Sequence, residues 1–124
     1  MEQLLLHLFG DYISQTEWMA TEKVKRNRAA LIHAFVYSLP FVLLTQSPLA
    51  LFVIFITHYF IDRYRLVRYL IFAKNWATNT KLKWVDCKDT GFHKDTPAWL
   101  SVWLMIIIDN TCHLIINYLA IIYL

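Results

Sequence analysis

The sequence has little charge, very little glycine and few cysteines. Of its 124 residues 17% are charged and only 2 are Gly, whereas 58% are hydrophobic. A soluble domain of this length needs far more polar surface to cover its core. The shortage of charge therefore argues against an ordinary soluble domain and favours a membrane protein.

Other absences narrow the class further. The two cysteines, Cys87 and Cys112, do not make a disulfide framework, and neither has a partner at metal-ligand spacing. The N-terminus lacks the basic start and the cleavage pattern of a signal peptide. The uneven placement of Lys and Arg indicates membrane topology, so no specific nucleic-acid binding is expected.

Four mostly apolar segments are predicted to be helices, at residues 4–19, 29–45, 49–72 and 97–124. The first is short enough to be spanning, re-entrant or interfacial. Pro40 lies inside the second, where a membrane helix tolerates a kink, and Pro48 suits the start of the third. The predicted fold is one all-α integral membrane domain over residues 1–124. It is a bundle of four transmembrane helices, or of three with one re-entrant, and residues 73–96 form a cytoplasmic loop.

The basic residues orient these helices. By the positive-inside rule the basic stretches 21–28 and 63–94 lie in the cytoplasm, whereas the uncharged turn at Gln46 and the C-terminus lie outside. The five tryptophans fall near the proposed cytoplasmic boundary, as interfacial aromatics do. They are Trp18, Trp76, Trp84, Trp99 and Trp103. Membrane lipid is thus an expected partner.

Three of the four segments carry a His and an Asp four residues apart. The pairs are His7 with Asp11, His58 with Asp62 and, in reversed order, Asp109 with His113, and the second segment adds His33. Residues at i and i+4 share one face of a helix. The pairs on the third and fourth segments fall at matching depths of roughly 15 to 22 Å in antiparallel helices. These side chains are therefore expected to meet in one layer of the bundle.

A layer of Asp and His side chains inside a membrane is expected to bind a cation. Each Asp at mid-membrane costs about 2.5–3.5 kcal/mol, and neighbouring carboxylates repel one another. Imidazoles and carboxylates are ligands of divalent metals. The predicted ligands are His7, Asp11, His33, His58, Asp62, Asp109 and His113. Seven ligands suit one or two divalent ions, zinc first and manganese, iron or nickel as alternatives, with two ions ~3.5–4 Å apart.

Several other polar residues have expected roles outside the ligand set. Gln15 and Asn117 lie one turn beyond Asp11 and His113, and they are expected to orient the ligands by hydrogen bonds. His93 is expected to be solvent-exposed in its loop. The arginines Arg63, Arg65 and Arg68 either snorkel to the interface or bind an anionic head group.

Several short stretches carry a resemblance to a known family. They are His-Leu-Phe-Gly-Asp at 7–11 followed by Gln-Thr-Glu-Trp-Met-Ala at 15–20, Leu-Ile-His-Ala at 31–34 and Thr-His-Tyr-Phe-Ile-Asp at 57–62. With them the chain resembles small phage and bacterial membrane proteins grouped as domain of unknown function 3307. The resemblance covers most of the chain, implies a place in the bacterial inner membrane and carries no settled activity. The layout is more loosely similar to bacterial inner-membrane metal-dependent hydrolases.

Together these features predict a membrane-embedded metal-dependent hydrolase with a site open to the cytoplasm. A bound metal lowers the pKa of water to about 7, and Asp11 or Asp62 is the expected general base. The expected substrate is a phosphoester or a lipid-linked phosphate. One alternative is an ion or proton channel or transporter that uses the same residues in a homo-oligomer. Another is a non-catalytic membrane effector of a phage, in which the cluster only holds the helices together.

Overall fold

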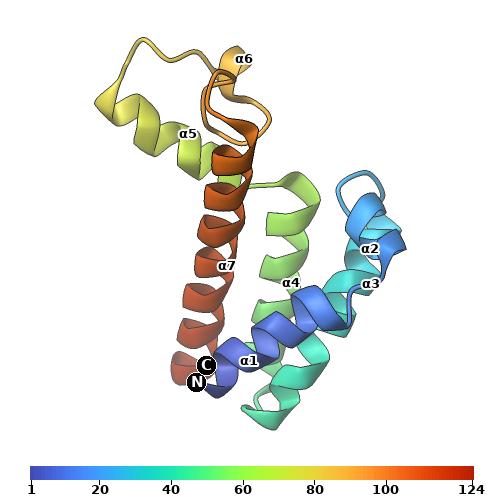
Figure 1. The fold of residues 1–124 in the computed structure, drawn as a ribbon. Helices are drawn as coiled ribbons and strands as arrows, with labels where there is room; N and C mark the ends of the chain where they lie inside the picture. The colour runs from blue at the N-terminus through green and yellow to red at the C-terminus, as the bar shows by residue number, and fades with distance from the viewer. The chain divides into compact units, whose positions relative to one another are not determined.

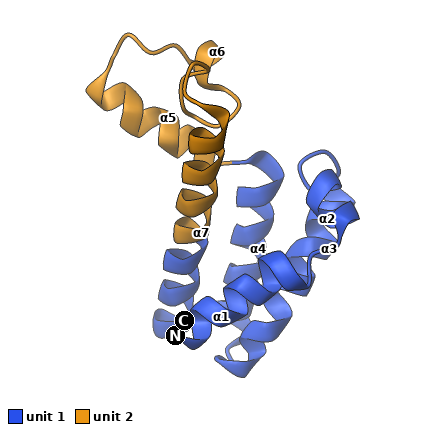
Figure 2. Ribbon diagram, in the orientation of Figure 1, with its two compact units in different colours: residues 1–65, 113–124 blue, residues 66–112 orange.

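The computed structural model describes all residues 1–124 and is helical, without strands. The helical class predicted from the sequence is thus confirmed. The chain forms two compact units (Figure 2). Unit 1 contains residues 1–65 and 113–124, and unit 2 contains residues 66–112. The long helix α7 (Ala98–Tyr123) contributes residues to both.

Unit 1 contains the helices up to and including α4 and the last residues of α7 (Figure 1). Its elements are α1 (Glu2–Leu8), the π-helical turn η1 (Phe9–Ile13), α2 (Glu17–Glu22), α3 (Asn27–Ser38), the 3-10 turn η2 (Leu39–Leu43) and α4 (Pro48–Tyr64). The Thr16 side chain caps α2 by accepting from the backbone N–H of Met19 at 3.3 Å. Ser47 caps α4 in the same way, and Pro48 occupies its first turn as predicted.

The core of unit 1 joins α3, α4 and α7. Its buried residues are Tyr37, Phe41, Ala50, Ile54 and Ala120. The Gln3 side chain donates to the backbone carbonyl of Leu114 at 2.6 Å, which ties α1 to the end of α7. The first and last residues of the chain therefore belong to one packed unit.

Gly10 decides how α1 approaches α3. It is buried within η1, and a Cβ atom at this position would lie 2.6 Å from Cδ2 and 3.3 Å from Cα of Tyr37. No real Cβ tolerates the first of these contacts, so the close approach requires glycine. The π-helical turn then carries the next residue, Asp11, into the buried interior.

Several predicted helix boundaries are wrong. The predicted helix 4–19 is interrupted after η1 and resumes as α2. The predicted helix 49–72 ends at Tyr64, because Arg65 adopts the left-handed conformation with φ 50° and ψ 50°. In that conformation the Arg65 N–H bonds to the Asp62 carbonyl at 3.3 Å and closes the helix. Glycine usually fills such a position, so the sequence carried no stop signal here.

Unit 2 contains α5 (Val67–Thr78), α6 (Trp84–Cys87) and the first part of α7. The predicted loop 73–96 is therefore partly helical. The Tyr69 and Trp84 rings stack at 4.7 Å, and Arg68 donates to the Lys88 carbonyl at 3.1 Å. A hydrogen bond from Lys94 lowers the pKa of Asp86. These contacts fold the polar segment back onto α5.

One helix, α7, is long and apolar enough to cross a membrane. The apolar stretch Asn27–Leu43 is shorter. Of the four spans predicted from the sequence, only the last therefore has the length and composition of a membrane span in the structure.

The contact at Gly10 predicts a cost for any larger residue. In Gly10→Ala the added methyl group must push α1 away from Tyr37, so we expect the free energy of unfolding to fall by about 1–3 kcal/mol. Thermal unfolding in detergent, followed by circular dichroism, measures this. Ile13→Ala is the control, since Ile13 is 73% exposed. Equal midpoints for Gly10→Ala and wild type would contradict the packing described here.

Candidate metal centre

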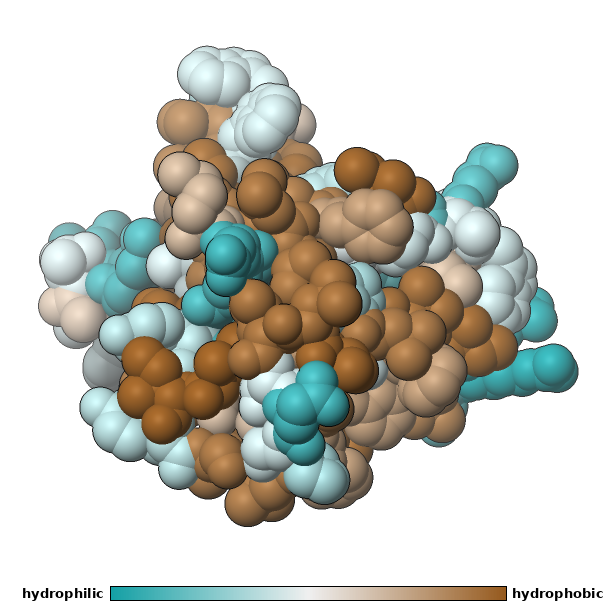
Figure 3. Space-filling model, turned by 90° about the horizontal axis from the view of Figure 1, so that it is seen from below, coloured by the Kyte–Doolittle hydropathy of each residue, from teal (hydrophilic) through white to brown (hydrophobic).

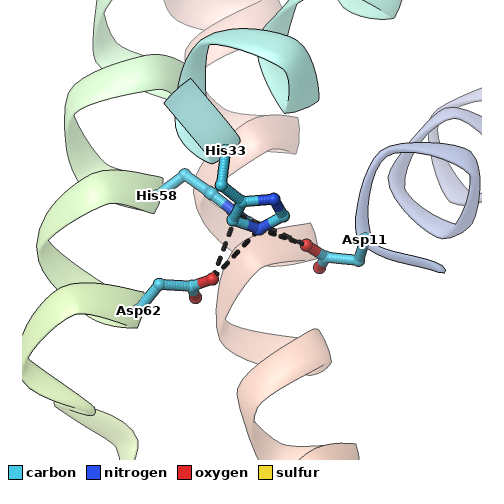
Figure 4. A group of neighbouring side chains, drawn as sticks. All are labelled: Asp11, His33, His58 and Asp62. Carbon is cyan, nitrogen blue, oxygen red and sulfur yellow. Dashed lines mark hydrogen bonds and ion pairs between the residues drawn. The ribbon is translucent and has the colours of Figure 1, made fainter. Parts of the chain in front are cut away.

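Four buried side chains converge in unit 1. Asp11 comes from η1, His33 from α3, and His58 and Asp62 from successive turns of α4 (Figure 4). Both imidazoles are fully buried, and each Asp residue is 7% exposed. Water therefore contributes little to compensating these polar groups, so their partners must come from the protein or from a bound ion.

The distances between these side chains match a tetrahedral metal site. Each Nε2 atom lies 3.2 to 3.4 Å from one oxygen of each carboxylate, and the two Nε2 atoms are 3.0 Å apart. Ligands about 2.0–2.1 Å from a tetrahedral zinc ion are separated by roughly 3.3 Å. All four ligand atoms lie within 4.8 Å of one another. The group can hold a metal ion without large rearrangement.

The hydrogen bonds around His58 orient its free electron pair toward this centre. His113 Nε2 lies 3.1 Å from Asp62 Oδ1, and His113 Nδ1 lies 3.2 Å from His58 Nδ1. Since a carboxylate only accepts, neutral His113 donates from Nε2 and accepts at Nδ1. His58 then carries its proton on Nδ1, which leaves Nε2 unprotonated. This is the tautomer that a metal ligand requires, and it is set by a carboxylate–histidine chain.

A second observation favours a cation. The Asp11 Oδ1 atom is buried and has no hydrogen-bond donor. The Lys23 ammonium lies 3.3 Å from His33 Nε2, so this nitrogen also presents an electron pair. Two imidazole nitrogens and two carboxylate oxygens thus converge, and of these four atoms Lys23 contacts His33 Nε2 and Asp62 Oδ2, whereas Asp11 Oδ1 has no donor. A divalent cation satisfies all four at once.

Tyr37 was not among the predicted site residues, but it packs against His58 of the centre. Its hydroxyl accepts from Asn117 Nδ2 at 2.6 Å and lies 2.8 Å from His7 Nδ1. Its ring stacks on His58 at 3.6 Å between centroids with an interplanar angle of 11°. The spacing of Tyr37 four residues after His33 was the signal in the sequence that places it on the same helix face.

Lys23 is a second unpredicted member of the site. Its ammonium group donates to Asp62 Oδ2 at 2.6 Å, and its side chain is only 19% exposed. In the sequence it is one of several cations in a basic connector, so nothing distinguished it from Lys25 or Arg26. The Lys23 ion pair brings a positive charge directly to the metal-ligand group.

The predicted residues fall into different places. Asp11, His33, His58 and Asp62 form the converging group, and His113 contacts it through Asp62. His7 lies 3.6 Å from Asp11 and bonds to Tyr37, whereas Asp109 belongs to unit 2.

Three further predicted polar residues, Gln15, Asn117 and His93, lie outside the converging group. Gln15 Oε1 is buried without a hydrogen-bond partner, and Asn117 bonds to Tyr37. His93 is in unit 2, 3.3 Å from Asp95. None of the three contacts the converging group through a hydrogen bond described here, so any influence of Asn117 passes through Tyr37.

Comparison with known proteins gives one family. The family model described as "Protein of unknown function (DUF3307)" matches residues 1–124. The comparisons with curated proteins and with solved structures gave no match.

The Tyr37 contacts predict a measurable loss of stability. Tyr37→Phe keeps the ring that stacks on His58 but leaves buried His7 and Asn117 groups without the hydroxyl. We expect the free energy of unfolding to fall by about 1–3 kcal/mol. Chemical unfolding in detergent measures this, with Tyr118→Phe as control because Tyr118 is 53% exposed. The network has no energetic role if both variants unfold like wild type.

Proposed function

The chain belongs to the family of proteins of unknown function DUF3307, and from its buried His/Asp group we propose that it is a membrane-embedded metal-dependent hydrolase. The observation that carries this proposal is the set of 3.0 to 3.4 Å separations among two Nε2 atoms and two carboxylate oxygens. Zinc is the ion that we favour, because it combines imidazole and carboxylate ligands in tetrahedral geometry.

The two carboxylates differ in what surrounds them. Asp62 already receives Lys23 and His113, whereas Asp11 Oδ1 has no hydrogen-bond donor. We therefore assign His33, His58 and Asp11 as the ligands that hold the ion. Two imidazoles and one carboxylate are a donor set found in catalytic zinc sites, where the fourth position takes water.

Asp62 is then the proton acceptor. When bound, the metal supplies Lewis acidity that makes a water molecule a nucleophile near neutral pH. Asp62 Oδ2 lies 3.2 Å from His33 Nε2 and 3.4 Å from His58 Nε2, so it is next to the position that the two imidazoles define. His113 fixes the other oxygen of Asp62 and holds the carboxylate in that orientation.

The surroundings of the site support a lipid environment. Large apolar side chains are exposed over the helices of unit 1, and hydrophobic residues cover much of the face that Figure 3 shows. Examples are Leu5, Ile13, Phe35, Leu43, Phe52 and Ile122, each between 52% and 81% exposed. Soluble monomers rarely expose apolar patches of this extent. We propose that α7 crosses the inner membrane and that the other helices of unit 1 pack in or against it.

A proton path is a second candidate, favoured by one specific feature. The side chains His33, His58 and His113 form a chain of ring contacts of 3.0 and 3.2 Å that ends on Asp62. Such a chain can pass protons along its ring nitrogens. Purified protein in liposomes separates the two functions, since a proton path gives flux down a pH gradient and a hydrolase turns over without one.

Metal analysis of ligand variants tests the assignment. We expect about one zinc ion per chain in wild type, and a loss of at least tenfold in affinity in His33→Ala and Asp11→Asn. Asp62→Asn is expected to retain the ion but to lose about 10²–10⁴-fold in hydrolysis of p-nitrophenyl phosphate or phosphatidic acid. Elemental analysis of detergent-purified protein and a phosphate-release assay measure both, with His93→Ala as control. Loss of metal in Asp62→Asn would instead make the site a closed structural one.

Membrane insertion predicts a different behaviour for charges at the middle and at the end of α7. A lysine near the middle of a span costs about 2.5–3.5 kcal/mol, so Ile107→Lys is expected to lower the amount of protein that resists carbonate extraction from membranes. Tyr123→Lys is the matched control, because a lysine at the helix end can snorkel to the interface. A wild-type chain that carbonate releases completely would contradict membrane insertion.

A further inference from the structure

The Lys23 ammonium group has no electron pair with which to bind a metal. It nevertheless lies among the carboxylate and imidazole atoms of the proposed metal site. It is 2.6 Å from Asp62 Oδ2 and 3.3 Å from His33 Nε2. A half-buried lysine at such a place favours a compensating charge, which Asp62 provides. The ammonium group therefore reaches the site from the connector between α2 and α3, residues 23–26.

This position of Lys23 is held from α4. Arg63 follows Asp62 directly and donates to the backbone carbonyls of Val24 and Lys25 at 2.7 and 3.3 Å. Its Nε atom donates to Asn27 Oδ1 at 2.7 Å. Two hydrogen bonds to the connector and one to the first residue of α3 thus attach this segment to the helix that carries the proton acceptor. These hydrogen bonds hold the connector in the position that places Lys23 at the site.

The charges at the site favour an anionic substrate. Asp11 and Asp62 bring two negative charges and Lys23 one positive charge, so these three side chains sum to −1. A divalent cation raises the sum to +1. Net charge in surroundings of this burial is costly. A substrate that brings an anionic oxygen lowers that cost, whereas an uncharged carboxylic ester leaves it in place.

We propose that Lys23 binds an anionic oxygen of the substrate beside the metal and thereby favours phosphate esters over uncharged esters. This inference rests on the proposed function and names the substrate class of the same site. Lysine is a point-charge binder of phosphate with three N–H donors on a flexible stem. The flexible stem lets the ammonium turn from Asp62 to a phosphoryl oxygen without movement of the backbone.

Binding of inorganic phosphate to the zinc-loaded protein tests this role. We expect Lys23→Met to raise the dissociation constant of phosphate about 10- to 100-fold with unchanged zinc content, whereas Lys23→Arg keeps most of the affinity. Lys25→Met is the matched control, because its side chain is 64% exposed and pairs only with Glu22 of α2. Isothermal titration in detergent gives the affinities. Equal affinity in Lys23→Met and wild type, with zinc bound, overturns the proposal and leaves the metal site intact.

If Lys23→Met does not fold, the accessibility of Lys23 in the wild-type protein tests the same proposal. Saturating phosphate is expected to slow the acetylation of Lys23 at least tenfold and to leave Lys25 unchanged, as read by mass spectrometry. Phenyl phosphate and phosphatidic acid in mixed micelles serve as competing ligands. Whichever protects at lower concentration shows whether the phosphate comes from a soluble ester or from a lipid. Acetylation of Lys23 that no phosphate compound slows overturns the proposal, whereas absence of zinc from wild type overturns the hydrolase function instead.

Discussion

Two carboxylates, Asp11 and Asp62, face two imidazoles where solvent hardly reaches, and their charge must be compensated inside the protein. Much of unit 1 is arranged around this requirement. Gly10 allows η1 to approach α3 closely, and the π-helical turn brings Asp11 into contact with groups from α3 and α4. Without that approach one of the two carboxylates would be missing from the site.

The compensation is distributed over several partners. His113 occupies one oxygen of Asp62, and Lys23 occupies the other. Tyr37 supports His58 by stacking and connects the site to the hydrophobic core, to which it also belongs. Asp11 Oδ1 lacks a donor, which makes it the point where a cation contributes most. In the proposed function, a metal ion and Lys23 would together give the site a positive charge suited to a phosphate group.

The spacing of polar residues predicted that His58 and Asp62 share a helix face, whereas the backbone geometry and the tertiary partners were not visible in the sequence. The i, i+4 pair His58 and Asp62 lies on one face of a regular helix, so its convergence could be predicted. The left-handed Arg65 could not be, since that conformation usually requires glycine. The π-helical turn at Asp11 lies where Gly10 closely approaches Tyr37, a residue of another helix.

Lys23 shows a second limit. Its neighbours are also basic, and only the folded connector shows which ammonium turns inward. Hydrophobicity likewise predicted helices but not their lengths, because α1 and α3 change within apolar stretches into the π-helical turn η1 and the 3-10 turn η2. Composition thus indicated four spans, of which α7 alone has the length for one.

X-ray absorption spectroscopy of the zinc-loaded protein tests the central claim, that a metal is held by two imidazoles and at least one carboxylate. The proposed site predicts a shell of nitrogen and oxygen at about 2.0–2.1 Å with the outer-shell scattering of two imidazole rings, and loss of one ring's scattering in His58→Ala. A spectrum of hydrated zinc without imidazole scattering, unchanged in His58→Ala, would contradict it.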